Sequence, residues 1–331
     1  MKVWKRSLPV WLLTLVMLLT ACGTPSQPDQ PDGTETWREA YEETGAYLQA
    51  QTAPTVGSIG GEWAVIGLSR ARLLSDETAQ SYEQTVEDYV KQAGSVRLHH
   101  AKSTENSRTI LGLTAAGYNA ANVAGVDLTA GLTDMAYLRA QGTNGPIWAL
   151  IALDCHDYDI PQCADGEEQT TREGLVAEIL SYQCSDGGWA LMGDESDVDM
   201  TAMALTSLAP YQEETDVKAA VDAALTYLSD AQQADGGFMS WGAANSESCA
   251  QVIVALTALG IDPAADSRFV KNGASPLDGL CAFACEGGGF CHSDEQMESD
   301  GMATEQGFYA LVAYDRFRQG KTRLFDMTDI A

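Results

Sequence analysis

Gln183-Cys-Ser-Asp-Gly-Gly-Trp189 is a segment that recurs along the chain. It returns as Gln232-Gln-Ala-Asp-Gly-Gly-Phe238 and, with fewer matches, as Glu286-Gly-Gly-Gly-Phe290. Each copy is followed, 11 to 14 residues after its aromatic residue, by a small residue that opens an apolar segment. The spacing between copies is about fifty residues, which is typical of proteins built from repeated structural units.

The small residues open three apolar segments with helical periodicity, Thr201–Leu208, Cys249–Leu256 and Thr304–Leu311. Fainter copies occur upstream, where Gly60-Gly-Glu-Trp63 and Asn144-Gly-Pro-Ile-Trp148 each lead into an apolar run. Once this template is applied to the whole chain, it predicts six apolar helices, near residues 62–74, 105–117, 145–154, 199–210, 246–259 and 302–318.

Amphipathic segments with charged faces alternate with these apolar helices. The fifth has Val217, Val221 and Leu225 at the spacing i, i+4, i+8, with Lys218 and Asp222 off that stripe. Helices that are apolar all round should be buried, and helices with one apolar stripe should cover them. Six alternations predict an all-α double ring in one domain, residues 37–331, whose outer helices lie near 37–51, 82–93, 131–140, 170–183, 216–232 and 275–285.

In such a ring, the Asp-Gly-Gly-aromatic loops would connect each outer helix to the next inner helix. Glycine ends an outer helix and lets the chain reverse through positive φ. The aromatic residue then packs between neighbouring hairpins. We therefore expect these loops to be structural and not to contact a ligand directly.

The N-terminus predicts export. Lys2, Lys5 and Arg6 precede an apolar run from Leu8 to Leu19, which is short for a membrane span but suits a signal peptide. Leu-Thr-Ala-Cys22 resembles the lipobox of bacterial lipoproteins, which implies cleavage before Cys22 and lipidation of its thiol. The alternative is an ordinary signal peptide with an incidental cysteine. Residues 1–22 are thus a predicted lipoprotein signal, and 23–36 a flexible linker.

The net charge excludes some classes of binding partner, and the cysteine content limits the possible disulfides. The net charge of -28 argues against nucleic acid as a partner and against unassisted binding to anionic lipid. Seven cysteines follow Cys22, an odd number that leaves at least one thiol unpaired or paired to another molecule. A short loop separates Cys155 from Cys163, so these two form the preferred bridge.

These repeats resemble those of squalene cyclases and protein prenyltransferase β subunits, which implies the α/α toroid fold. Residues 170–329 are still more similar to a group of exported bacterial proteins that carry this repeat, many without an assigned reaction. Transcobalamin and intrinsic factor, which carry corrinoids outside cells, resemble the same architecture more distantly. The resemblance is specific over 170–329 and weak over 37–169.

A catalytic hypothesis concerns Asp197-Val-Asp199-Met200-Thr-Ala202. It resembles the Asp-x-Asp-Asp-Thr-Ala motif with which class II terpene cyclases protonate an alkene, and the resemblance makes Asp199 the proton donor and Asp197 its partner. Met200 replaces the third aspartate, which weakens the acid that such a reaction needs. The alternative is that Asp199 is an N-cap or first-turn acid that stabilises the exposed amides at the start of its helix. Acids near the start of other inner helices would do the same: Glu62, Glu105 and Glu247.

We expect no cofactor, and the sequence supports a metal site less than it supports the catalytic hypothesis. Asp278-Gly-Leu-Cys281 nearly matches the zinc motif of prenyltransferase β subunits. Thiolates and imidazole suit tetrahedral zinc, and the candidates are Cys281, Cys285, Cys291 and His292. A packed helix with one disulfide, Cys285 with Cys291, explains the same cluster. An acidic loop offers oxygen ligands for calcium, although solvation explains it equally: Asp194, Glu195, Asp197 and Asp199.

The sequence therefore favours a surface lipoprotein whose ring binds a ligand at the loop-bearing end of the inner helices. A polar or cationic small molecule, a corrinoid or a peptide would suit an acidic pocket rimmed by Trp and Gln. The candidate pocket residues are Trp63, Trp148, Asp199, Thr201, Glu247, Gln251, Thr304 and Gln306. The alternatives are an enzyme related to terpene cyclases and prenyltransferases, and a protein-interaction platform that uses the acidic outer ring. A ligand-sized cavity favours binding or catalysis, and a plugged centre favours the platform.

Overall fold

The computed structural model describes residues 33–51 and 54–330. The predicted signal peptide and Cys22 lie outside the described residues. Helix α1 (Gly33–Ala50) begins within the predicted linker, so residues 33–36 are helical and the prediction is wrong for them. Within the described residues, no helix is long and apolar enough to cross a membrane.

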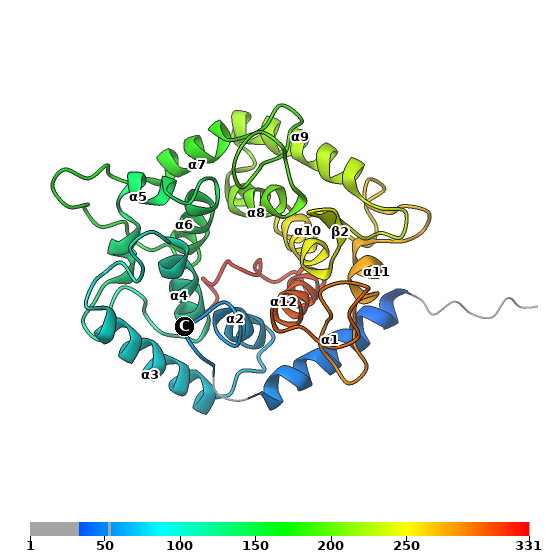
Figure 1. The fold of residues 1–331 in the computed structure, drawn as a ribbon, viewed down its shortest axis with the longest axis horizontal. Helices are drawn as coiled ribbons and strands as arrows, with labels where there is room; N and C mark the ends of the chain where they lie inside the picture. Colours follow the sequence, from blue (N-terminus) through cyan, green and yellow to red (C-terminus); the bar gives the residue numbers. More distant parts are fainter. Residues whose placement is uncertain (1–32, 52–53, 331) are drawn as a thin grey trace, which may run out of the picture.

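The described helices form two concentric rings (Figure 1). Outer and inner helices alternate along the chain, as the sequence predicts. The inner ring consists of α2 (Glu62–Arg70), α4 (Thr104–Ala115), α6 (Asn144–Asp154), α8 (Val198–Leu208), α10 (Ser246–Ala258) and α12 (Gly301–Arg318). The outer ring consists of α1, α3 (Asp76–Ala93), α5 (Met135–Arg139), α7 (Arg172–Ser181), α9 (Thr215–Ala231) and α11 (Pro276–Cys281).

Small elements complete the described part of the chain. Two short 3₁₀ helices, η1 (Leu128–Leu132) and η2 (Ala209–Tyr211), lie in connections between hairpins. Strands β1 (Met239–Ser240) and β2 (Ala243–Ala244) pair antiparallel just before α10, with Met239 opposite Ala244. This hairpin belongs to the loops at one end of the ring, where it lies close to α8.

Burial follows the two kinds of sequence pattern. In α6, every residue from Gly145 to Leu153 is buried, because the helix is surrounded by its neighbours. In α9, the predicted stripe Val217, Val221 and Leu225 is buried, while Lys218 and Asp222 are exposed. Each inner helix packs against the next, and α12 packs against α2, so the inner ring closes.

The repeated loops are held by the same hydrogen bonds in successive hairpins. The Gln183 amide donates to the carbonyl oxygens of Gly187 (2.8 Å) and Ala220 (2.9 Å), and so ties the loop to the next outer helix. The Gln232 amide donates in the same way to Gly236 and Phe269. Gly236 has φ +86°, and a Cβ there would collide with the backbone of α11's N-cap residue. The loops are therefore structural, as predicted.

The C-terminal segment, residues 319–330, closes the end of the ring where the inner helices finish. The Met327 N–H donates to the carbonyl of Cys155 at the end of α6 (2.7 Å). Arg70 of α2 and Arg316 of α12 both pair with Asp329, at 2.6 and 2.7 Å. Burial alone would raise the pKa of Asp329, but these two guanidinium groups outweigh it and hold the pKa at about 2.

All seven cysteines of the described residues are free thiols. The predicted bridge between Cys155 and Cys163 is therefore wrong. Cys155 is buried at the end of α6, where burial raises the pKa of its thiol to about 12. Cys163 lies in the following loop, where its thiol donates to the carbonyl of Glu167 (3.6 Å).

Candidate functional site

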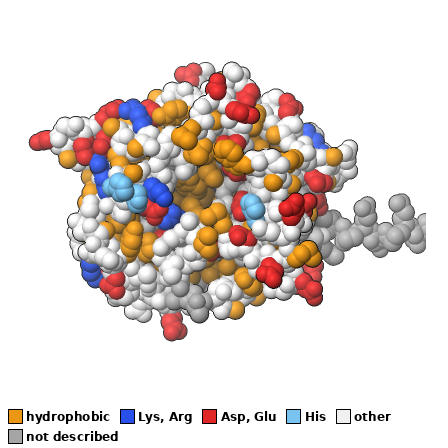
Figure 2. Space-filling view, in the orientation of Figure 1, with side chains coloured by type: hydrophobic (Ala, Val, Ile, Leu, Met, Phe, Trp, Pro, Cys, Tyr) orange, Lys and Arg blue, Asp and Glu red, His pale blue; other side chains and the backbone are white. Residues whose placement is uncertain are grey.

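The end of the ring where the inner helices begin is hollowed at its centre, and we call this hollow the mouth. Hydrophobic side chains lie within it, and acidic side chains and a histidine lie at its edge (Figure 2). Predicted pocket residues near the mouth come from four inner helices: Trp63 of α2, Trp148 of α6, Asp199 of α8, and Glu247 and Gln251 of α10.

Asp197 and Asp199 have different roles at the start of α8. Asp197 is the N-cap: its Oδ1 accepts a hydrogen bond from the Met200 N–H at 2.8 Å. Asp199 lies in the first turn but does not cap the helix. Of the two structural roles predicted for Asp199, the N-cap position is taken by Asp197, and Asp199 is the acid of the first turn.

The carboxylate of Asp199 lies beside the hydroxyls of Ser240 in β1 and Ser248 in α10. Burial raises its pKa, while Ser248, Ser240 and His292 oppose the rise. Neither hydroxyl completes a hydrogen bond of normal geometry: Asp199 Oδ1, Ser240 Oγ and Ser248 Oγ are all buried without a partner in the described structure. Because serine hydroxyls rotate, Ser240 and Ser248 act on the Asp199 carboxylate and oppose the rise of its pKa, although no hydrogen bond of normal geometry is complete at this side of the mouth.

The other acids at the starts of inner helices are already paired. Glu62 bonds Arg108 at 2.9 Å, and Arg108 also bonds Glu105 at 2.5 Å. Glu247 lies 2.9 Å from Nδ1 of His292, whose side chain is 48% exposed at the rim. Of these four acids, Asp199 is the one with a buried oxygen that lacks a partner.

Aromatic rings form the floor of the mouth. Trp63 and Trp148 have ring centroids 5.0 Å apart, and Tyr309 lies 6.0 Å from Trp63. Phe325 of the C-terminal segment packs against Trp148 (5.8 Å) and Tyr309 (6.2 Å) from below. We call these four residues the central aromatic cluster. It lies between the mouth and the C-terminal segment, where a cavity of about 350 Å³ remains beside Phe325.

A buried hydrogen-bond network joins this floor to the acidic side. The Gln251 amide donates to Gln306 Oε1 (2.9 Å) and to the hydroxyl of Tyr309 (2.5 Å). Burial raises the pKa of Tyr309, and the negative charges of Asp199, Glu247 and Glu305 raise it further, whereas Gln251 opposes the rise. Carboxylates beside aromatic faces form an environment that stabilises cations.

Two predicted pocket residues, Thr201 and Thr304, use their hydroxyls to hold repeat loops. The Thr201 hydroxyl accepts a hydrogen bond from the Trp189 N–H (2.9 Å), and Thr304 does the same for Phe290 (3.0 Å). Both threonines are buried, and each fixes the aromatic residue of its own repeat loop. Their hydroxyls are therefore engaged within their own repeats, and Thr304 also lines a cavity between α1, α2 and α12.

The predicted metal ligands do not form a metal site in the described residues, although Cys285 and Cys291 lie together. Within the described residues, no three His, Cys, Asp or Glu side chains are placed to hold a metal ion. His292 bonds Glu247, and the thiols of Cys285 and Cys291 both lie near the carbonyl of Phe283. Asp197 is engaged as a cap, so neither the zinc set with Cys281 nor the calcium set with Asp194 and Glu195 is assembled.

Three residues of the mouth were not predicted from the sequence: Tyr309, Ser240 and Phe325. Gln251 and Gln306 were predicted, and they occupy equivalent positions, two residues after Cys249 and Thr304, so the repeat could also have predicted that they pair. Tyr309 lies three residues after Gln306 on the same helix face, so its position beside Gln306 could also be predicted from helical spacing. Ser240 and Phe325 lie in irregular segments, where periodicity gives no direction for a side chain.

Comparisons with known proteins concern the fold. No protein-family model matches the chain, and no curated protein matches it in sequence. Among solved structures, the unsaturated glucuronyl hydrolase of Bacillus sp. GL1 aligns with a TM-score of 0.56 at 10% identity, over 88% of this chain and 98% of that one.

The molecule is an α/α toroid. The predicted fold class is thus confirmed. Type II terpene cyclase MstE from Scytonema aligns at 14% identity with a TM-score of 0.46, over 85% of this chain and 97% of that one. ent-Copalyl diphosphate synthase from Streptomyces platensis aligns at 16% identity with a TM-score of 0.48, over 76% of this chain and 49% of that one. The toroid spans about half the length of that synthase, and these identities bear on the fold alone.

Proposed function

We propose that the toroid is the binding domain of an exported lipoprotein and that its mouth takes an organic cation. One observation carries the proposal: on one side of the mouth, the Asp199 carboxylate has two serine hydroxyls beside it but no Lys or Arg, and its buried Oδ1 forms no hydrogen bond of normal geometry in the described structure. A cation there would pair with Asp199 and lie against the face of Trp63 or Trp148, two interactions that reinforce each other.

Charge supports this choice of ligand. The chain carries a net charge of -28, which draws cations towards the protein and repels anions. Acidic sugars and isoprenoid diphosphates would meet Asp199 and Glu247 at the mouth. A small amine, a quaternary ammonium or the basic side chain of a peptide would meet favourable charge instead.

Tryptophan fluorescence offers the test, because Trp63 and Trp148 lie at the mouth. Choline and spermidine are titrated into the protein, with 3,3-dimethylbutanol as the neutral analogue of choline. Cobalamin and a basic tripeptide cover the corrinoid and peptide classes. We expect saturable binding of a cation and none of the neutral analogue. Equal responses to both would contradict a cation site.

Lipid anchoring at Cys22 places this domain outside the cytoplasm, held to the cell membrane by its N-terminus. The sequence from Lys2 to Cys22 supports it. A Cys22→Ser variant is expected to leave the membrane fraction, whereas the unaltered chain sediments with membranes. Membrane association that survives this substitution would show that the lipobox does not anchor the protein.

An enzyme with Asp199 as proton donor is the second candidate. Its support is the raised pKa of Asp199, since a carboxyl that holds its proton can donate it. Met200 is buried where terpene cyclases carry a third acid, which counts against it. Incubation with a linear isoprenoid, followed by a search for cyclised product in the Asp199→Asn variant as well, decides between acid catalysis and binding.

A further inference from the structure

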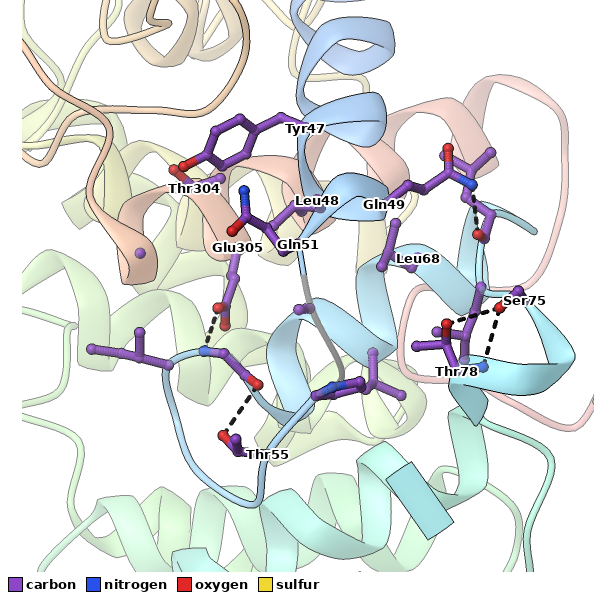
Figure 3. A pocket seen from close by; sticks show the side chains of 18 residues that line it. Tyr47, Leu48, Gln49, Gln51, Thr55, Leu68, Ser75, Thr78, Thr304 and Glu305 are labelled. Atoms are coloured by element: carbon purple, nitrogen blue, oxygen red, sulfur yellow. Dashed lines mark hydrogen bonds between the residues drawn. The ribbon is translucent and has the colours of Figure 1, made fainter. Parts of the chain in front are cut away.

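A second cavity, of about 400 Å³, lies where the ring closes, between α1 and α2 of the first hairpin and α12 of the last. We call it the seam cavity. Its size is within the range of small-molecule sites. Leu48, Val65 and Leu68 are among its apolar lining residues, and Tyr47 and Glu305 provide polar groups (Figure 3).

Glu305 has a buried oxygen without a partner in this cavity. The residue is 3% exposed. Its Oε1 accepts a hydrogen bond from the Gly60 N–H at 2.6 Å, and its Oε2 has no partner in the described structure. None of the described residues that line the cavity is lysine or arginine. A buried carboxylate without a counter-charge is costly, so a ligand that supplies one would be strongly favoured.

The charged groups near Glu305 are acidic, and none of them supplies a positive charge to its carboxylate. Burial is the main cause that raises its pKa to about 7, with Glu62 and Asp300 adding to the rise and the backbone N–H groups of Gly60 and Ala64 opposing it. Glu62 is paired with Arg108 of α4, and Asp300 caps α12. On the α1 side, the Tyr47 hydroxyl is engaged with Ser299 at 3.2 Å.

We infer that the seam cavity binds a small organic ammonium with an apolar body, its nitrogen on Glu305 Oε2 and its body against Leu48, Val65 and Leu68. This site is distinct from the mouth. Glu305 and Gln306 are consecutive on α12, so their side chains diverge, and Gln306 faces Gln251 at the mouth.

Occupancy of the seam would act on the whole ring. The ligand contacts α1, α2 and α12, and therefore holds the first and last hairpins together. Because it binds the folded ring alone, it raises the stability of the ring by mass action. An ammonium pairs with the ionised form of Glu305, so affinity should rise as the pH increases through 7.

Calorimetry and thermal unfolding of the full-length protein test the inference with phenethylamine as the probe and 2-phenylethanol as its neutral analogue. Glu305→Gln removes the charge but keeps an oxygen for Gly60. Ala64→Leu fills the cavity, since Ala64 lines it. Asp199→Asn alters the mouth and is the matched control. Circular dichroism confirms that each variant is folded, and two seam variants keep the test decisive if one is not.

We expect a saturable seam site that binds phenethylamine at least tenfold more tightly than the alcohol, that tightens from pH 6 to pH 8, and that both seam variants abolish, while any phenethylamine bound at the mouth remains bound in those variants. Asp199→Asn should leave it intact. The inference is overturned if no binding occurs, if the alcohol binds equally well, or if both seam variants bind as the parent does. Loss in Asp199→Asn alone would place the amine in the mouth, so failure at the seam is distinguishable from failure of the proposed function.

Discussion

Asp197 and Asp199 are two positions apart at the start of α8, yet their carboxylates have different surroundings. The Asp197 carboxylate accepts a hydrogen bond from the Met200 N–H and so caps the helix. Asp199 faces Ser240 and Ser248 from neighbouring elements and has a buried oxygen without a partner. A motif names the residue types but not their directions, which depend on how α8, α10 and the β-hairpin pack together.

Glu305 allows a residue-level prediction about pH. Its folded-state pKa of about 7 lies above the ordinary value of 4.5, so the folded protein holds this proton more tightly than the unfolded chain. Its stabilising contribution is present below pH 4.5 and is lost as the pH rises through 7. Glu305→Gln should therefore raise the free energy of unfolding by up to about 3 kcal/mol at pH 8 and by much less at pH 5.

Urea denaturation at the two pH values measures this difference. Glu298→Gln is the control, because Glu298 is exposed in the loop before α12, and it should change stability little at either pH. If Glu305→Gln instead lowers the free energy of unfolding at pH 8, the ionised carboxylate is stabilised by partners in the folded protein, and the prediction is wrong.

At the scale of the element, one hydrogen bond joins each inner helix of the central repeats to its preceding loop. Thr201 accepts from Trp189, Thr304 accepts from Phe290, and the thiol of Cys249 lies against the backbone of Phe238 in the same place. Thr201→Val keeps the shape but leaves the buried Trp189 N–H without a partner. We expect a loss of about 1–3 kcal/mol in unfolding free energy.

Thr206→Val is the matched control on the same helix, since Thr206 is half-buried and donates to the carbonyl of Ala202 (2.9 Å) without holding a loop. Chemical denaturation should show a much smaller loss for this variant. Equal losses of unfolding free energy in Thr201→Val and Thr206→Val would mean that the hydrogen bond to the loop does not contribute to stability.

The sequence predicts these elements well because each helix has its own apolar pattern. All six inner and six outer segments are found, although α2 ends at Arg70 and not near residue 74. The segment predicted near 131–140 begins with the 3₁₀ turn η1 and continues as the short α5. Helix ends depend on turn geometry and tertiary contacts, which periodicity does not contain.

At the scale of the whole molecule, the C-terminal segment decides how deep the mouth is. Phe325 closes the centre from the far end, packed on Trp148 and Tyr309. No repeat or periodicity in residues 319–330 predicts this plug. From the sequence, a plugged centre would favour an interaction platform and a ligand-sized cavity would favour binding or catalysis. Phe325 occupies part of the centre, but a cavity of about 350 Å³ lies beside it and the mouth is hollow, so the centre is not fully plugged.

Phe325→Ala should remove a buried ring from the central aromatic cluster and leave a cavity. We expect a loss of about 3–5 kcal/mol in unfolding free energy, as for other buried phenylalanines. Trp241→Ala is the control, because Trp241 is 85% exposed and its removal should change stability little. A Phe325→Ala variant as stable as the parent would mean that the segment does not seal the ring.

Cation binding at the mouth depends most on Asp199 as its anchor. Isothermal titration of spermidine into the parent, Asp199→Asn and Glu305→Gln proteins at pH 7 tests this directly. We predict at least a tenfold loss of affinity in Asp199→Asn, corresponding to about 1.4 kcal/mol, and little change in Glu305→Gln. Equal affinity in the parent and Asp199→Asn proteins would contradict it.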